Sequence, residues 1–161
     1  MTDFLVLAAI LLAALAALPV LAVRELVALA RGRRRGGRAD RLRTVALLSG
    51  LGALAVYAWG ALHLLGAVLT AEDGGTDSSP LIPCREGGIE RALQVVDYDV
   101  GYLPLGFTCV RSTGDDYTVA LPGYVNPAFA VLGLAAVASG ILARAAAERA
   151  DGRAPTADRT R

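Results

Sequence analysis

His63 is the only histidine of the chain, and it lies inside a long run of residues without charge. An imidazole in such a place can relay protons or contact a ligand, which makes His63 a candidate functional residue. Steps of three and four residues along a helix place it in one row with Ser49, Gly52, Trp59 and Gly66. Because small and hydrogen-bonding residues favour helix packing, we expect a neutral imidazole bonded to another helix. A proton relay or a ligand contact is the alternative.

The two cysteines, Cys84 and Cys109, lie in one polar segment with 24 residues between them, and neither lies in an apolar run. A pair of this kind predicts a disulfide, which forms and persists in an oxidising compartment. The segment that contains the two cysteines is therefore expected outside the cytoplasm.

Carboxylates occur in two close pairs, Asp97 with Asp99 and Asp115 with Asp116. Their spacing matches no calcium-binding loop, so we expect solvated loop charge and no metal site. The sequence has no CxxC pair, no glycine-rich phosphate loop and no GxSxG motif. A serine or cysteine nucleophile would lack a histidine base, because the sole histidine lies in an apolar run. We therefore expect no enzymatic activity and no cofactor.

The sequence RGRRRGGR at residues 31–38 is a dense basic cluster. Such a cluster by itself is typical of a patch that binds nucleic acid or anionic lipid. No nucleic-acid-binding module accompanies it, and arginines beside an apolar run ordinarily set the orientation of a membrane protein. We expect contact with the lipid bilayer and none with nucleic acid.

Three apolar runs must position these residues. Residues 4–23, 45–69 and 124–143 carry no charge, and the chain of 161 residues is 55% hydrophobic with only 19% charged residues. Twenty helical residues extend over about 30 Å, which is the thickness of the hydrocarbon core of a bilayer. The sequence thus predicts three transmembrane helices. The first is expected to be an uncleaved anchor, because no basic residue precedes it.

The charges of the connecting segments differ in sign. Residues 24–43 contain eight arginines against two acidic residues, a net charge of +6, whereas residues 71–123 contain nine acidic residues against three arginines, a net charge of −6. Because short arginine-rich loops stay in the cytoplasm, we expect the N-terminus outside and the C-terminus inside. The chain uses arginine and no lysine and is rich in alanine and glycine. This composition indicates a GC-rich genome, so we expect a bacterial plasma membrane.

The loop between the second and third helices is expected to hold a small folded part. Residues 88–94 predict a helical turn, residues 93–98 a strand, and residues 107–111 and 117–121 a β-hairpin around Gly114. A part of this size buries too little to be stable alone, so we expect the disulfide and the membrane helices to support it. Tyr98, Tyr102 and Tyr117 fit either packing within it or contacts with a partner. Asn126 and Pro127 are expected to cap the third helix.

The predicted fold is an all-α membrane protein with three transmembrane helices and a small, disulfide-stapled, partly β loop. Its predicted segments are a short outer N-terminus with the first helix (1–23), an arginine-rich cytoplasmic loop (24–43), the second helix (44–70), the extracytoplasmic loop (71–123), the third helix (124–143) and a disordered cytoplasmic tail (144–161).

The function expected from these features is that of a non-enzymatic accessory, scaffold or immunity-type subunit of the cell envelope. It would act through contacts with another membrane or envelope protein, or with further copies of itself. An oligomeric transport or permeation component that uses His63 is one alternative, and a ligand-sensing membrane protein is another. Coupled transport is disfavoured because no acidic or basic side chain lies within the three apolar runs.

Overall fold

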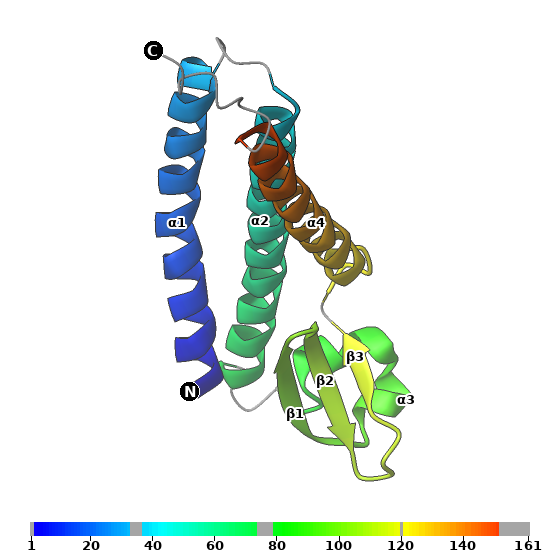
Figure 1. Cartoon of the computed structure of the whole chain (residues 1–161). Coiled ribbons are helices and arrows are strands. Elements are labelled where there is room, and N and C mark those ends of the chain that lie inside the picture. The colour runs from blue at the N-terminus through cyan, green and yellow to red at the C-terminus, as the bar shows by residue number, and fades with distance from the viewer. Residues whose placement is uncertain (1, 33–36, 74–78, 120, 152–161) are drawn as a thin grey trace, which may run out of the picture. The chain divides into compact units, whose positions relative to one another are not determined.

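The computed structural model describes residues 2–32, 37–73, 79–119 and 121–151 of the chain. Most of these residues belong to three long helices, α1 (Thr2–Gly32), α2 (Arg38–Glu72) and α4 (Val125–Asp151), as Figure 1 shows. Each of the three contains a stretch that is long and apolar enough to cross a membrane. The prediction of three such helices is therefore confirmed.

The helices extend beyond the apolar runs that predicted them. Helix α1 continues through Arg24 to Gly32 and α2 begins at Arg38, so most of segment 24–43 is helical and not a loop. Helix α4 continues to Asp151, so the disordered tail expected from residue 144 is wrong for residues 144–151. Residues 152–161 and 33–36 lie outside the described part. Alanine, leucine, glutamate and arginine dominate these extensions and are strong helix formers, so the helix outlasts the apolar run.

Between α2 and α4 lies the insert, which we define as residues 79–119. It contains the short helices η1 (Ile82–Gly87) and α3 (Ile89–Ala92) and the strands β1 (Val95–Tyr102), β2 (Leu105–Arg111) and β3 (Tyr117–Val119). The strands form an antiparallel sheet in the order β1-β2-β3. The predicted hairpin is confirmed, because Cys109 pairs with Tyr117 and Gly114 has φ +83° in the connection. A positive φ is the conformation that glycine adopts without strain.

The chain divides into two compact units. Unit 1 comprises residues 1–17 and 55–128, and unit 2 comprises residues 18–54 and 129–161. Unit 1 therefore contains the insert together with the beginning of α1 and the end of α2.

One hydrophobic core runs through unit 1. Its most deeply buried side chains come from both helices, from the insert and from the start of α4, namely Leu7, Leu64, Val68, Cys84, Phe107, Cys109 and Val125. The insert thus shares its core with the helices, as its small size predicts. Gly60 permits this close approach, because a Cβ at that position would lie 2.6 Å from side-chain carbons of both Leu105 and Val125.

Candidate functional site

The disulfide joins helix η1 to the central strand of the insert. Cys84 and Cys109 are bonded, their Cα atoms lie 6.0 Å apart, and both residues are fully buried. The bond that the sequence predicts is therefore present. Because it connects η1 to β2 at the middle of the sheet, it fixes the position of the two short helices against the strands.

Tyr117 reinforces the same connection from strand β3. Its hydroxyl donates a hydrogen bond of 2.7 Å to the carbonyl of Cys84. Its ring lies over Gly87, where an added Cβ would collide with the ring carbons. Tyr117 therefore contributes to the internal packing of the insert, and its hydroxyl is already bonded within the chain.

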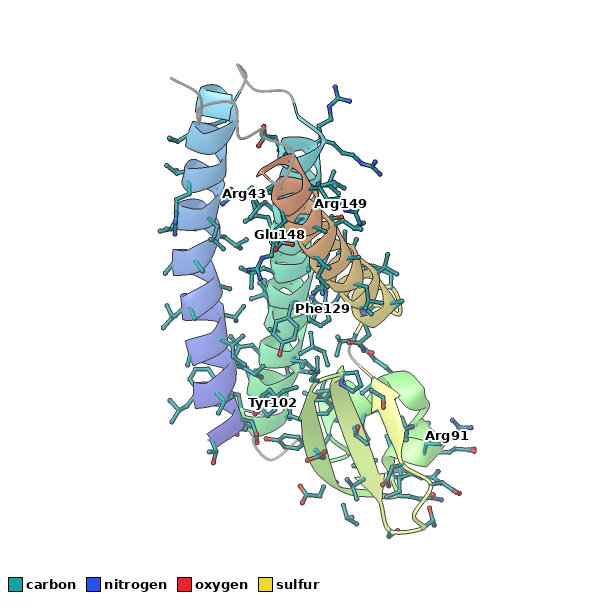
Figure 2. The ribbon with its side chains drawn as sticks, viewed as in Figure 1. Arg43, Arg91, Tyr102, Phe129, Glu148 and Arg149 are labelled. Atoms are coloured by element: carbon teal, nitrogen blue, oxygen red, sulfur yellow. A yellow bond between two sulfur atoms is a disulfide. The ribbon has the colours of Figure 1, made fainter. Side chains whose placement is uncertain are left out.

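Tyr98 and Tyr102 connect strand β1 to the two neighbouring helices. The hydroxyl of Tyr102 donates to Asp3 of α1 at 2.7 Å, and its carbonyl accepts a 2.8 Å hydrogen bond from Tyr57 of α2. Tyr98 stacks on Phe107, with ring centroids 5.0 Å apart, and donates to Glu72 at 3.3 Å. Burial raises the pKa of Tyr98, and the Glu72 carboxylate raises it further. Figure 2 shows Tyr102 beside the helix ends in unit 1.

The environment of Tyr102 predicts an alkaline titration step. Burial, with the hydrogen bond to Asp3, raises the pKa of Tyr102 to about 12. The fold therefore favours the neutral phenol, and the stability linked to this group is complete below the ordinary tyrosine pKa of about 10 and is lost as the pH rises through the raised pKa. In Tyr102→Phe, the tyrosinate absorbance recorded after a rapid pH jump should lack the step near pH 12. A Tyr124→Phe control should keep it; its persistence in Tyr102→Phe would contradict this assignment.

Asn126 holds the insert to the start of α4, a role that its sequence position did not reveal. Its side-chain nitrogen donates to the carbonyl of Leu105 at 2.8 Å, and its side-chain oxygen accepts from the amide of Leu105 at 3.0 Å. Helix α4 begins at Val125, so Asn126 lies within its first turn and is not the cap that the Asn-Pro pair predicts. The Asn-Pro pair predicts a cap, in which only the side-chain oxygen accepts, whereas here both polar groups of the side chain bond to Leu105.

Among the residues that the structure describes, the hydrogen-bond partner of His63 lies on its own helix. Its Nδ1 lies 2.9 Å from the carbonyl oxygen of Trp59, and its ring meets the Trp59 ring edge-on with centroids 4.7 Å apart. A carbonyl only accepts hydrogen bonds, so this geometry requires a proton on Nδ1. The contact across elements is made by Trp59, whose Nε1 donates to the hydroxyl of Tyr124 at 3.2 Å. This hydrogen bond connects α2 to Tyr124, the residue that precedes α4.

The row of small residues around His63 does not form one continuous contact. In unit 2, a Cβ at Gly52 would lie 3.4 Å from Leu132 of α4, and Ser49 in the same unit is partly buried. In unit 1, a Cβ at Gly66 would meet no atom within 4 Å. Because a helix face turns gradually about its axis, residues seventeen positions apart need not face the same neighbour.

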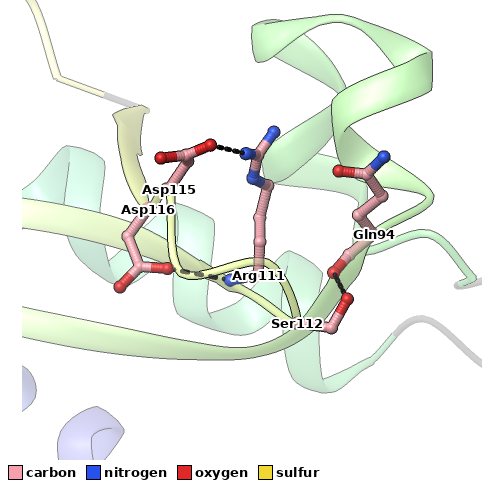
Figure 3. Close-up of polar contacts among 5 residues, drawn as sticks. All are labelled: Gln94, Arg111, Ser112, Asp115 and Asp116. Carbon is pink, nitrogen blue, oxygen red and sulfur yellow. Dashed lines mark hydrogen bonds and ion pairs between the residues drawn. The ribbon is translucent and has the colours of Figure 1, made fainter.

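Asp115 and Asp116, which were predicted to be solvated loop charge, both bond to Arg111 in the connection from β2 to β3. Arg111 forms a 3.0 Å ion pair with Asp115, and its amide donates to Asp116 at 2.9 Å. The next residue, Ser112, donates its amide to the carbonyl of Gln94 at 3.0 Å. Figure 3 shows the side-chain contacts of this group. The bonds of Ser112 hold Gln94, where α3 meets β1, against the end of β2.

Exposed apolar side chains surround that junction. Ile89, Leu93 and Val96 are 56%, 68% and 68% exposed, and we call these three residues the α3–β1 corner. Ile89 and Leu93 lie four residues apart, which places them on one side of the helical turn. Val96 lies at a register shift of β1, where a bulge turns its side chain out of the sheet. In Figure 2, Arg91 of α3 points away from the strands of the insert.

No family model, no curated protein and no solved structure matches the chain. Among residues 2–32, 37–73, 79–119 and 121–151, no three His, Cys, Asp or Glu side chains lie together in a group that could hold a metal ion. In unit 1, the disulfide connects the insert's strands to η1, and side-chain hydrogen bonds connect them to α1, α2 and α4. The α3–β1 corner remains exposed.

Proposed function

We propose that the chain is a non-enzymatic membrane subunit that presents the insert to another protein of the cell envelope. The observation that carries this proposal is the α3–β1 corner. Three large apolar side chains are exposed within eight residues on a part of the chain that a disulfide and several backbone hydrogen bonds hold rigid. Clustered exposed apolar side chains favour association, and a rigid surface loses little conformational entropy when it binds.

In this proposal, the three tyrosines that the sequence singled out stabilise the insert. The hydroxyls of Tyr98, Tyr102 and Tyr117 donate to Glu72, Asp3 and the Cys84 carbonyl, respectively. A hydroxyl that donates a hydrogen bond internally has to break that bond before it can donate to a partner, and only its oxygen stays able to accept. The partner therefore contacts the apolar corner first, and the tyrosines keep the corner in place.

The proposed orientation places the N-terminus and the insert outside and the C-terminus in the cytoplasm of a bacterial cell. Two independent features support it. The arginine-rich segment 24–43 favours the cytoplasmic side, and the Cys84–Cys109 disulfide favours an oxidising compartment for the insert.

Photo-crosslinking tests this function at single positions. A photo-reactive amino acid at position 93 should give one adduct of defined mass in native membranes. The same amino acid at position 103 is a matched control, because Leu103 is 76% exposed but lies at the β1–β2 connection, away from the corner. Leu93→Ala should weaken recovery of the partner by about tenfold, as truncation of a residue at the centre of an interface does, and Leu103→Ala by less than about twofold.

Both variants should retain the stability of the parent chain to within about 0.5 kcal/mol, because both side chains are exposed. Equal adducts from positions 93 and 103, or unchanged recovery of the partner in Leu93→Ala, would contradict the proposal that the α3–β1 corner contacts the partner.

A further inference from the structure

The N-terminal end of α2 and the C-terminal end of α4 border an open cavity of about 540 Å³ within unit 2. Cavities of this size are within the range of small-molecule binding pockets. Small and aliphatic residues form most of the wall, and two arginines complete it, one from each helix. The residues that line the cavity include Gly37, Arg38, Leu42, Leu142, Ala146 and Arg149.

Two positive charges border this apolar space without a counter-charge in contact. Among the described residues, the side chains of Arg38 and Arg149 make neither an ion pair nor a hydrogen bond. Asp40 follows Arg38 in the first turn of α2, and Glu148 precedes Arg149 on α4, but neither carboxylate lines the cavity. Figure 2 shows Glu148 and Arg149 near the end of α4.

The first turn of α2 adds backbone donors to the same place. The amide of Arg41 donates to the carbonyl of Gly37 at 3.2 Å, so the helical hydrogen bonds start there. The amides of Arg38 and Ala39, two lining residues, precede that first bond and have no partner within the helix. Free amides at a helix N-terminus favour an anion, and here they belong to residues that line the same cavity as Arg149.

The cavity also lies at the ends of two helices that are long and apolar enough to cross a membrane. Phospholipid headgroups are found at this level of a membrane protein, and basic pockets between transmembrane helices bind anionic headgroups. A free anion would use the arginines and leave Leu42, Leu142 and the alanines of the wall exposed to water. A phospholipid uses both, because its phosphate meets the charges and its glycerol and upper acyl carbons cover the apolar wall.

We propose that this cavity binds the headgroup of an anionic glycerophospholipid, with Arg38 and Arg149 as the residues that contact the phosphate. The site is separate from the insert and does not depend on the proposed partner. It gives the chain a preference for anionic lipid that differs from the general attraction of a basic segment, because it depends on two particular arginines.

Native mass spectrometry of the purified chain in detergent tests this site with two lipids of identical acyl chains. Phosphatidylglycerol should bind about tenfold more tightly than phosphatidylcholine, since charge-assisted hydrogen bonds favour the anionic headgroup. The double variant Arg38→Gln with Arg149→Gln should lose this preference, and its affinity for phosphatidylcholine should stay within about twofold of the parent.

The matched control is Arg43→Gln with Arg144→Gln, which removes one charge from each of the same helices. Both control residues are exposed and neither lines the cavity. This control should weaken phosphatidylglycerol binding by less than about threefold, because charges that do not line the cavity act on the lipid only through screened attraction. An equal loss in the two double variants would mean diffuse attraction to the basic segment and would overturn the proposal.

Two further measurements separate a lipid site from a site for a small anion. Ala146→Leu fills part of the cavity without a change of charge and should weaken phosphatidylglycerol binding by about fivefold or more, because the displaced headgroup loses packing. Inorganic phosphate at millimolar concentration should not displace the lipid. Displacement by phosphate alone, or unchanged binding in Ala146→Leu, would contradict a lipid-binding cavity.

Discussion

Removal of the Cys84–Cys109 disulfide is expected to lower the free energy of unfolding of the insert by about 3 to 4 kcal/mol. The chain-entropy model predicts this loss because the bond closes a loop with 24 residues between its ends, which restricts the unfolded chain. The insert has few other ways to compensate, because its core is small and is completed by the helices of unit 1. A loss of this size is a large fraction of the stability of a small domain.

The test compares the parent chain with Cys84→Ala/Cys109→Ala in detergent micelles, with denaturation followed by pulse proteolysis of the insert. The reductant supplies the control, because it should destabilise the parent chain by a similar amount and leave the double variant unchanged. If the double variant unfolds at the same denaturant concentration as the parent, the helices alone support the insert and the disulfide is dispensable.

Asn126→Ala is expected to destabilise unit 1 by about 2 to 6 kcal/mol. The asparagine side chain satisfies both the amide and the carbonyl of Leu105, which is only 3% exposed. Removing it leaves two buried backbone groups unpaired, and each such group costs about 1 to 3 kcal/mol. The effect should concentrate where β2 begins beside the first turn of α4.

Amide hydrogen exchange gives a local reading of the same change. The amide of Leu105 should lose most of its protection in Asn126→Ala, whereas amides in the middle of β2 should change less. Ser112→Ala is a suitable control, because its hydroxyl makes only a long, exposed hydrogen bond of 3.5 Å to Gln94. Retained protection at Leu105 in Asn126→Ala would show that solvent or another group replaces the asparagine.

The helices and the hairpin could be predicted because their signals are local. An uncharged run of twenty or more residues indicates a helix that can cross a membrane, and turn residues between two β-prone stretches indicate a hairpin. The disulfide followed from the presence of two cysteines in one polar segment. The helices and the hairpin do not depend on which distant residues meet in the folded chain, and the disulfide has only one possible pairing because the chain has two cysteines.

The contacts of Asn126, His63 and the tyrosines could not be predicted, because they depend on tertiary proximity. Asn126 carries the signal of a helix cap, but strand β2 lies close enough to take its hydrogen bonds. His63 was expected to reach another helix, but the carbonyl of Trp59 one turn away on its own helix accepts the bond. The ends of α1 and α4 were predicted too early in the chain. An apolar run ends at the first charged residue, whereas a helix continues through charged residues that have a high helix propensity.

The most direct test of the proposed function is the intact mass of the complex recovered from native membranes after crosslinking in the cell. We expect a stoichiometric complex with one different protein, with crosslinks that map to Leu93 or its neighbours in the α3–β1 corner. A stable monomer, or a closed oligomer of this chain alone, would contradict a role as the subunit of another envelope protein. The closed oligomer would favour the permeation alternative, in which His63→Leu abolishes transport.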